Sequence, residues 1–319
     1  MAKNLSSILA SAIDETTEVL KKNPPIKDVE PEDLDADSLP DANATTWFRL
    51  KNVVTVFADL KSSTQLSVGK HPASTAAIYR AATGNVAQIM NGLDADFIQI
   101  QGDGVFGLYW GDKAYERAVC AGITVKTFSE KTLQPKLEGR WPDAPQTGFK
   151  VGIASGRVLV KNVGTPRNVN QQEPIWAGKP VNYAAKAAQQ ADRNQLIVTG
   201  TVWLAIENND YLTVSCAHGE DDSAPSPATL WSDVEIEKLG HDVDDSAGRL
   251  LEACWCDQCG PEFMQAVLNG ETTRDETNEV TESESASESS AQFDLKRANL
   301  ARLAHERGMK VIRKSRRRK

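Results

Sequence analysis

The sequence predicts an α+β fold in which helices pack against a mixed sheet. Segments 51–58, 96–101 and 104–110 are rich in β-branched and aromatic residues, and a short glycine-containing turn separates the last two. Segments 73–92 and 112–129 carry apolar residues at helical spacing. Because hairpins are mixed with helices, the order favours α+β over a doubly wound parallel sheet.

The N-terminal segment 1–46 precedes this domain. A short amphipathic helix is predicted over 4–22, where Leu and Ile fall on one helical stripe and a proline pair follows. The remainder of the segment is acidic and contains further prolines, which predicts a linker or an irregular wrap. The main domain is therefore expected over 47–240.

The second half of the main domain continues the same mixture of elements. A hairpin is predicted from two strands joined through Ser155-Gly156. The two strands of this hairpin are expected over 149–154 and 157–162. After them we expect a helix over 179–191, a strand over 196–199, a helical turn over 202–206, and strands over 211–216 and 229–237.

Three segments of distinct composition follow the main domain. Segment 241–270 is a cysteine-rich extension. Segment 271–292 is acidic, rich in Ser and Thr and poor in large apolar residues, so disorder is expected. Segment 293–319 is strongly basic and predicts a helix or tail. It could bind nucleic acid, anionic lipid or an acidic partner, fold back onto the acidic stretch 271–290, or simply be solvated.

The composition excludes several classes of protein. With 36 basic and 44 acidic residues the net charge is −8, which argues against a general nucleic-acid binder. No run of 18 apolar residues is present, so no membrane span is expected, and the N-terminus does not resemble a secretory signal. Five unevenly spaced cysteines favour a reducing compartment, and we expect the protein in the cytoplasm.

Two aspartates interrupt the apolar strands. Asp59 ends the run Val56-Phe57-Ala58 before a polar turn, and Asp103 lies at the tip of the first predicted hairpin. If these strands are neighbours, the two carboxylates meet at one end of the sheet. Oxygen ligands of this kind suit Mg²⁺ or Mn²⁺, which commonly handle nucleotide phosphates. The alternative is that each Asp only stabilises its own turn.

A third motif follows at Ile175–Lys186. Asn182 and Lys186 are four residues apart, so they share one face of the predicted helix. Asn can orient a ribose, and Lys can neutralise charge on a phosphate. Taken alone, an ordinary exposed helix face explains this pair equally well.

Together these motifs resemble the class III nucleotidyl cyclases. The matching pieces are Phe57-Ala58-Asp59-Leu60, Gly102-Asp103-Gly104, Gly152-Ile153-Ala154-Ser155-Gly156 and Gly178–Lys186, and they cover about residues 50–237 in family order. The resemblance implies a ferredoxin-like βαββαβ core with added strands, and a head-to-tail homodimer with active sites at its interface.

The resemblance also implies roles for individual residues. Asp59, Asp103 and the carbonyl of Leu60 would bind two ions of Mn²⁺ or Mg²⁺, and the partner chain would supply Asn182 and Lys186. Lys186 departs from the family pattern, which has Arg, so the charge is kept without the planar fork. The residues expected to hold the triphosphate are Phe57, Lys61, Ser62, Ser63 and Thr64.

The base-reading positions depart from both purine patterns. Adenylate cyclases similar to this chain have Lys where Gln99 stands, and guanylate cyclases have Glu there. Ile175 occupies the second position, with Trp176 beside it as a base contact or as packing. The chain most resembles the pyrimidine cyclases of the bacterial antiphage system Pycsar, in which Tyr79 or Arg80 would contribute to base choice.

This likeness favours UTP as the substrate and 3′,5′-cyclic UMP as a messenger that activates a separate effector. Three alternatives remain at this point. They are a cytidylate cyclase making cyclic CMP, a purine cyclase with an atypical pocket, and a non-catalytic nucleotide-binding module.

The cysteine-rich segment contains a second candidate metal site. Cys254, Cys256 and Cys259 lie within six residues, and the spacing of the last two suits a metal knuckle. Cys216, His218 and His241 lie upstream and would complete a zinc site. The alternative is free or buried thiols, since no second Cys-x-x-Cys matches the first.

Overall fold

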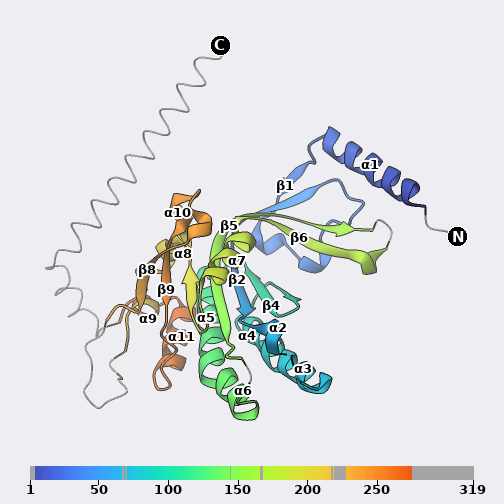
Figure 1. Ribbon diagram of the computed structural model, residues 1–319. Helices are drawn as coiled ribbons and strands as arrows, with labels where there is room; N and C mark the ends of the chain where they lie inside the picture. The colour runs from blue at the N-terminus through green and yellow to red at the C-terminus, as the bar shows by residue number, and fades with distance from the viewer. Residues whose placement is uncertain are drawn as a thin grey trace.

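The computed structural model describes residues 4–274, except 67, 69, 144, 166, 167, 217 and 219–227. The predicted basic tail 293–319 and most of the acidic linker lie outside the described residues. Within these described residues, the strands form one nine-stranded sheet (Figure 1). They are β1 (Ile26–Asp28), β2 (Trp47–Leu60), β3 (Phe97–Gln101), β4 (Gly104–Tyr109), β5 (Phe149–Gly164), β6 (Gln172–Gly178), β7 (Leu196–Val198), β8 (Trp231–Glu235) and β9 (Ala247–Leu251).

Helices pack on both faces of the sheet. Two of the predicted helices continue through π-helical turns, so that α3 runs through Arg80–Gly84 into α4, and α5 runs through Ser129–Leu133 into α6. The α-helices are α1 (Leu5–Lys21), α2 (Ser63–Leu66), α3 (Pro72–Tyr79), α4 (Asn85–Gly92), α5 (Ala114–Phe128), α6 (Gln134–Arg140), α7 (Lys179–Gln190), α8 (Gly200–Ile206), α9 (Asp210–Thr213), α10 (Val243–Ser246) and α11 (Gly260–Asn269).

The first half of the main domain forms a βαββαβ unit. Its four strands lie in the order β3-β4-β2-β5, and the connections run through α3–α4 and through α5–α6. Strand β7 then extends the sheet parallel to β5, and β9 and β8 complete this edge. The α+β prediction is confirmed. Part of segment 241–270 belongs to this sheet, because β9 lies between β7 and β8.

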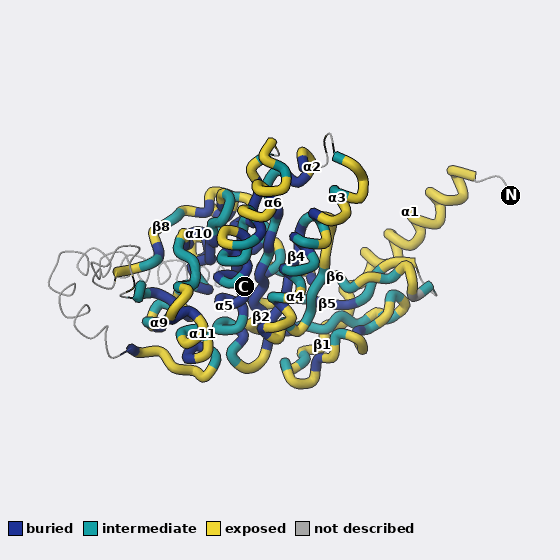
Figure 2. Tube along the Cα trace, turned by 90° about the horizontal axis from the view of Figure 1, so that it is seen from below, coloured by how far each residue is buried: buried dark blue, intermediate teal, exposed yellow. Residues whose placement is uncertain are grey.

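Alternate residues of β2 divide the core into two layers. Val54, Val56 and Ala58 are fully buried in the cluster that includes α4 and α5. Phe57 faces the opposite side and packs against the clusters that contain α7 and Trp176. Figure 2 shows the buried central strands, whereas helix α1 has no buried residue. Within the described residues, no helix combines the length and apolarity needed to cross a membrane.

The predicted hairpin at Ser155-Gly156 is wrong. Residues 149–164 form one continuous strand, which pairs with β2 on both sides of Gly156. The pairing changes register between Leu50 and Val53 of β2, where one extra residue makes a bulge, and Gly156 lies opposite Val53 with φ +147°. The glycine therefore allows a bend within a long strand, where the sequence suggested a turn.

The predicted strand over 211–216 is also wrong. Residues Asp210–Thr213 form the short helix α9, and Asn209 caps it by accepting the backbone N–H of Tyr211. Only Val214 makes a strand-like bridge, with Thr229. Asn at the capping position outweighs the β-propensity of the residues that follow, because it satisfies a helix N–H that would otherwise lack a partner. Strands β6 and β9 and helix α11 were not predicted from the sequence.

Helix α7 lies directly on β5 at Gly152. A Cβ atom at Gly152 would stand 2.1 Å from the Ala184 carbonyl oxygen and 2.4 Å from the Ala188 nitrogen. The Gly152→Ala substitution should lower the free energy of unfolding by about 1–3 kcal/mol or more, because helix backbone must move away. Urea unfolding measures the difference.

Gly139→Ala is the matched control. Gly139 lies in α6, and no atom stands within 4 Å of its added Cβ. This substitution should be neutral or stabilise by up to about 1 kcal/mol, because Ala has the higher helix propensity. Equal effects of the two substitutions would contradict the close contact of α7 with β5.

Candidate active site

The structure places Asp59 and Asp103 at the same end of the sheet. Asp59 is the second-last residue of β2, and its cross-strand partner on β4 is Gly104. Asp103 immediately precedes Gly104 in the two-residue turn between β3 and β4. The first turn residue, Gly102, has φ +64°, a conformation that glycine adopts without strain. The register of β2 with β4 therefore brings the two acidic residues side by side.

Each aspartate has a local partner. Asp59 pairs across to Lys150 on β5, and the Lys150 Nζ lies 2.6 Å from the Asp59 Oδ2. The Asp59 side chain is 27% exposed and the Lys150 side chain 17%, so solvent screens this ion pair only partially. The Ser63 hydroxyl donates a hydrogen bond to the Asp103 Oδ2. Asp59 is thus compensated by a cation, whereas Asp103 accepts from a neutral hydroxyl.

The turn after β2 is held by several interactions. The Lys61 backbone N–H donates to the Gly148 carbonyl (3.0 Å), and its own carbonyl accepts the Thr147 hydroxyl (2.6 Å). Ser62 adopts the left-handed region with φ 61°. The Lys61 ammonium hydrogen-bonds Asp192, and this bond lowers the pKa of the Asp192 carboxyl. The turn is therefore fixed in shape close to Asp59.

Asn182 and Lys186 lie one turn apart on α7, as their spacing predicted. The Asn182 side chain is exposed, and its amide donates to the Gly178 carbonyl at 3.1 Å. The Lys186 Nζ lies 5.4 Å from the centre of the Tyr183 ring. Across the described part of the chain, neither residue makes a hydrogen bond or ion pair with Asp59 or Asp103. Within the described residues of one chain, Asp59 and Asp103 therefore lie together, but no hydrogen bond or ion pair connects them to Asn182 or Lys186.

The predicted base-contact residues are divided between the two faces of the sheet. Gln99 is half-buried and lies opposite Phe106, so it faces the same side as that ring. Ile175 is 43% exposed, whereas Trp176 is 6% exposed. Tyr79 is half-buried and Arg80 exposed at the junction of α3 with its π-helical turn.

Helix α3 packs on the other side of the sheet from Trp176. Its Ile78 belongs to the core cluster of α4 and α5, whereas Trp176 belongs to the cluster with Phe106 and Val53. The Trp176 ring centre lies 5.0 Å from that of Phe97 and 5.5 Å from that of Trp110. The indole therefore fills the core within one chain.

Two curated proteins resemble most of this chain, although no family model matches it. The uridylate cyclase of Micromonospora echinofusca is 51% identical over 271 residues, which is 85% of this chain and 86% of that protein. This chain belongs to the uridylate cyclase family. A second member, from Propioniciclava tarda, is 45% identical over 273 residues, again 85% of this chain and 86% of the relative. The prediction of a nucleotidyl cyclase is confirmed at the level of the family.

The crystal structure of the adenylyl cyclase CyaB from P. aeruginosa has a TM-score of 0.46 and 18% sequence identity, and the match covers 57% of this chain and 92% of that one.

In this member of the uridylate cyclase family, Lys150 is the site residue that sequence reasoning missed. It stands second in β5 among buried residues, where a charged side chain needs a partner. A lysine inside the otherwise apolar run 149–154 was the available signal. The sequence did not reveal that Asp59 is the partner of Lys150, because the β2–β5 register depends on a bulge that the sequence did not reveal.

The packing of Trp176 gives a test of its role. The buried Trp176 Nε1 donates no hydrogen bond among the described residues. Trp176→Ala should lower the free energy of unfolding by about 3–5 kcal/mol, because a large ring is lost from the core. Trp176→Phe should cost less, about 1–2 kcal/mol, because an aromatic ring remains and no hydrogen bond is broken.

Urea unfolding of both Trp176 variants checks this. An alanine variant as stable as the unmodified chain would show that Trp176 does not support the fold. Equal losses in the two variants would show that the retained aromatic ring adds nothing to the packing.

Proposed function

We propose that this chain converts UTP into 3′,5′-cyclic UMP and pyrophosphate. The observation that carries the proposal is the juxtaposition of Asp59 and Asp103 at one sheet end, in a chain 51% identical to a uridylate cyclase. A nucleotide triphosphate needs cations at its phosphates, and paired carboxylates supply a place for them.

The donor set fits hard divalent cations. Asp59 and Asp103 offer carboxylate oxygens, and Leu60, whose side chain is buried, can contribute only its backbone carbonyl. Oxygen ligands of this type match Mg²⁺ or Mn²⁺ better than softer metals. When bound, such ions neutralise the triphosphate and favour loss of the proton from the ribose 3′-hydroxyl.

Lys150 has a defined part in this proposal. Its ammonium compensates the charge of Asp59 in the chain as described. If Asp59 held a cation, Lys150 would no longer need this partner and could pair with a phosphate oxygen of the substrate. The turn from Lys61 to Thr64 then lines the same end of the sheet and orients the triphosphate, with Phe57 beneath it.

The complete site needs a second copy of the chain. Asn182 and Lys186 are not joined to the aspartates within one chain, and the Asn182 side chain is exposed. A head-to-tail homodimer would bring this helix face of one copy to Asp59 and Asp103 of the other. Asn182 would then orient the ribose, and Lys186 would stabilise charge on the phosphate as the 3′-oxygen attacks in line.

The product would act as a second messenger in antiphage defence. Cyclic UMP formed on infection would diffuse to a separate effector and activate it. This cellular role follows the likeness to Pycsar pyrimidine cyclases, and the enzyme would work in the cytoplasm without spanning a membrane.

The reaction is tested by supplying each of the four labelled nucleoside triphosphates with Mn²⁺ and identifying the products. We expect cyclic UMP as the main product and no cyclisation after chelation of the metal, because the carboxylates alone cannot neutralise a triphosphate. Cyclic CMP would replace the uridylate assignment by a cytidylate one. Cyclic AMP or cyclic GMP as the main product would reject pyrimidine selection, and no product at all would indicate a nucleotide-binding module.

Asp59→Ala should reduce the rate at least about a hundredfold, because a group that stabilises transition-state charge is lost. Asp143→Ala is a matched control, since Asp143 is exposed and belongs to no part of the site. A fully active Asp59→Ala enzyme would reject the metal assignment.

Mixing two inactive variants tests the shared site. Asp59→Ala and Lys186→Ala damage opposite halves of the proposed site. Co-folded at equal amounts, they should recover about a quarter of the original activity, because half of the dimers are mixed and each mixed dimer has one intact site of two. Radiolabelled product formation measures the recovery.

The control is a mixture of Asp59→Ala with Asp103→Ala. Both substitutions lie in the same half-site, so every site in a mixed dimer keeps one lesion and no activity should return. Recovery in this control, or none in the first mixture, would contradict the split arrangement.

A further inference from the structure

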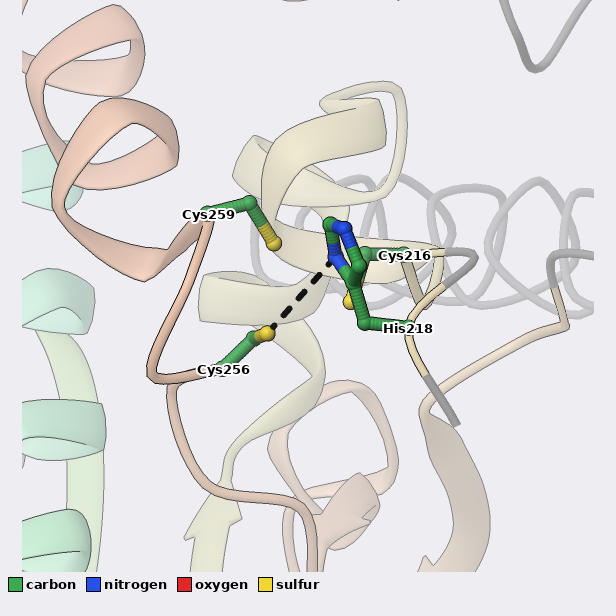
Figure 3. Close-up of side chains that lie close together, drawn as sticks. All are labelled: Cys216, His218, Cys256 and Cys259. Atoms are coloured by element: carbon green, nitrogen blue, oxygen red, sulfur yellow. Dashed lines mark hydrogen bonds between the residues drawn. The ribbon is translucent and has the colours of Figure 1, made fainter. Parts of the chain in front are cut away.

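Three cysteines and one histidine converge beside helices α9 and α11. They are Cys216, His218, Cys256 and Cys259, and their ligand atoms all lie within 4.8 Å of one another. Figure 3 shows the four side chains pointing toward one another from two separate segments. All four are among the candidate ligands named from the sequence, although the two segments are about 40 residues apart along the chain.

Of the six candidate ligands named from the sequence, Cys254 and His241 lie outside the cluster. The Cys254 Sγ points away and accepts a hydrogen bond from the Lys126 Nζ at 3.2 Å. Cys216 takes its place in the cluster. His241 also lies elsewhere, with its Nε2 3.2 Å from the Tyr183 hydroxyl.

The spacing within the cluster matches a four-coordinate metal. A tetrahedral ion with sulfur ligands at about 2.3 Å and nitrogen at about 2.0 Å places neighbouring ligand atoms about 3.5–3.8 Å apart. The Cys256 Sγ and the His218 Nδ1 are 3.9 Å apart. All five cysteines are free thiols, so no disulfide competes for these sulfurs. Little movement is needed to close the four ligands around one ion.

The segment that carries Cys256 is fixed by helix α5 and its extension. The Trp255 backbone N–H donates to the Thr127 hydroxyl, and its indole N–H donates to the Thr124 hydroxyl, both at 3.0 Å. The Lys131 Nζ contacts the Asp257 carboxylate at 2.6 Å and the Trp255 carbonyl at 3.0 Å. These bonds hold the loop in place before α11 begins, so two ligands are preorganised.

The segment that carries Cys216 is fixed independently. The Arg274 Nη2 donates to the carbonyls of Val214 (3.1 Å) and Ser215 (3.0 Å). The Ser215 N–H donates to the Ala228 carbonyl at 2.8 Å. Cys259 lies at the base of the cluster and is buried, whereas His218 lies at the exposed rim. The two segments thus meet with their sulfurs inward and the imidazole toward solvent.

We infer that Cys216, His218, Cys256 and Cys259 bind one structural Zn²⁺ ion. Three thiolates and one imidazole are a ligand set that zinc prefers, and four protein ligands leave no open position for catalysis. The ion would cross-link the segment after α9 to the start of α11, and so secure the edge of the sheet formed by β8 and β9. This site is independent of the proposed cyclase reaction.

The first experiment measures metal in the whole chain purified under reducing conditions from zinc-containing medium. We expect about one zinc per chain. After zinc is removed, Co²⁺ titration should give the d–d and sulfur-to-metal charge-transfer bands of a tetrahedral thiolate site. Iron in place of zinc would overturn the identity of the ion. Absence of bound metal together with absence of the Co²⁺ bands would overturn the site itself.

Matched substitutions assign the ligands. Cys259→Ser and His218→Ala should lower the zinc content about tenfold or more, whereas Cys254→Ser and His241→Ala should leave it unchanged. Asp59→Ala should also retain zinc, which separates this site from the proposed catalytic ions. If the ligand variants fail to fold, the Co²⁺ titration of the unmodified chain still decides the matter. Full zinc content in both ligand variants would reject this ligand set.

Discussion

The pairing of β2 with a strand on each side is the constraint on which the site depends. Strand β2 lies between β4 and β5, and its register sets Asp59 opposite both Gly104 and Lys150. Val54, Val56 and Ala58 hold this register, because they bury one face of the strand under α4 and α5. A slip by one residue would turn Asp59 into that apolar layer and expose the valines, at a cost far greater than the stability of any single contact.

The second constraint is the close approach of α7 to β5. At Gly152 the helix backbone occupies the space where any other residue would place its Cβ. Buried Ala184 and Ala187 keep the helix close, while Asn182 and Lys186 stay on its outer side. Small residues at the contact thus fix where the polar face points, which is the geometry a shared site between two copies requires.

The chain keeps two kinds of potential metal donor apart. Hard oxygen donors lie at the end of β2, and soft sulfur donors lie beside α9 and α11. Zinc favours thiolates and imidazole, whereas Mg²⁺ and Mn²⁺ favour carboxylates, so the two proposed sites do not compete for one ion. The proposed thiolate site would be structural, because its four protein ligands leave no open position for catalysis.

The sequence by itself determined the α+β order, the hairpin that carries Asp103, the helix that carries Asn182 and Lys186, and the resemblance to nucleotidyl cyclases. These features are local, or depend on motifs whose spacing can be counted. Only the tertiary structure decided that 149–164 is one strand, that Lys150 is the partner of Asp59, and that Cys216 joins the thiol cluster while Cys254 does not. Each of these depends on pairing between segments distant in sequence, and local propensity carries no information about such pairing.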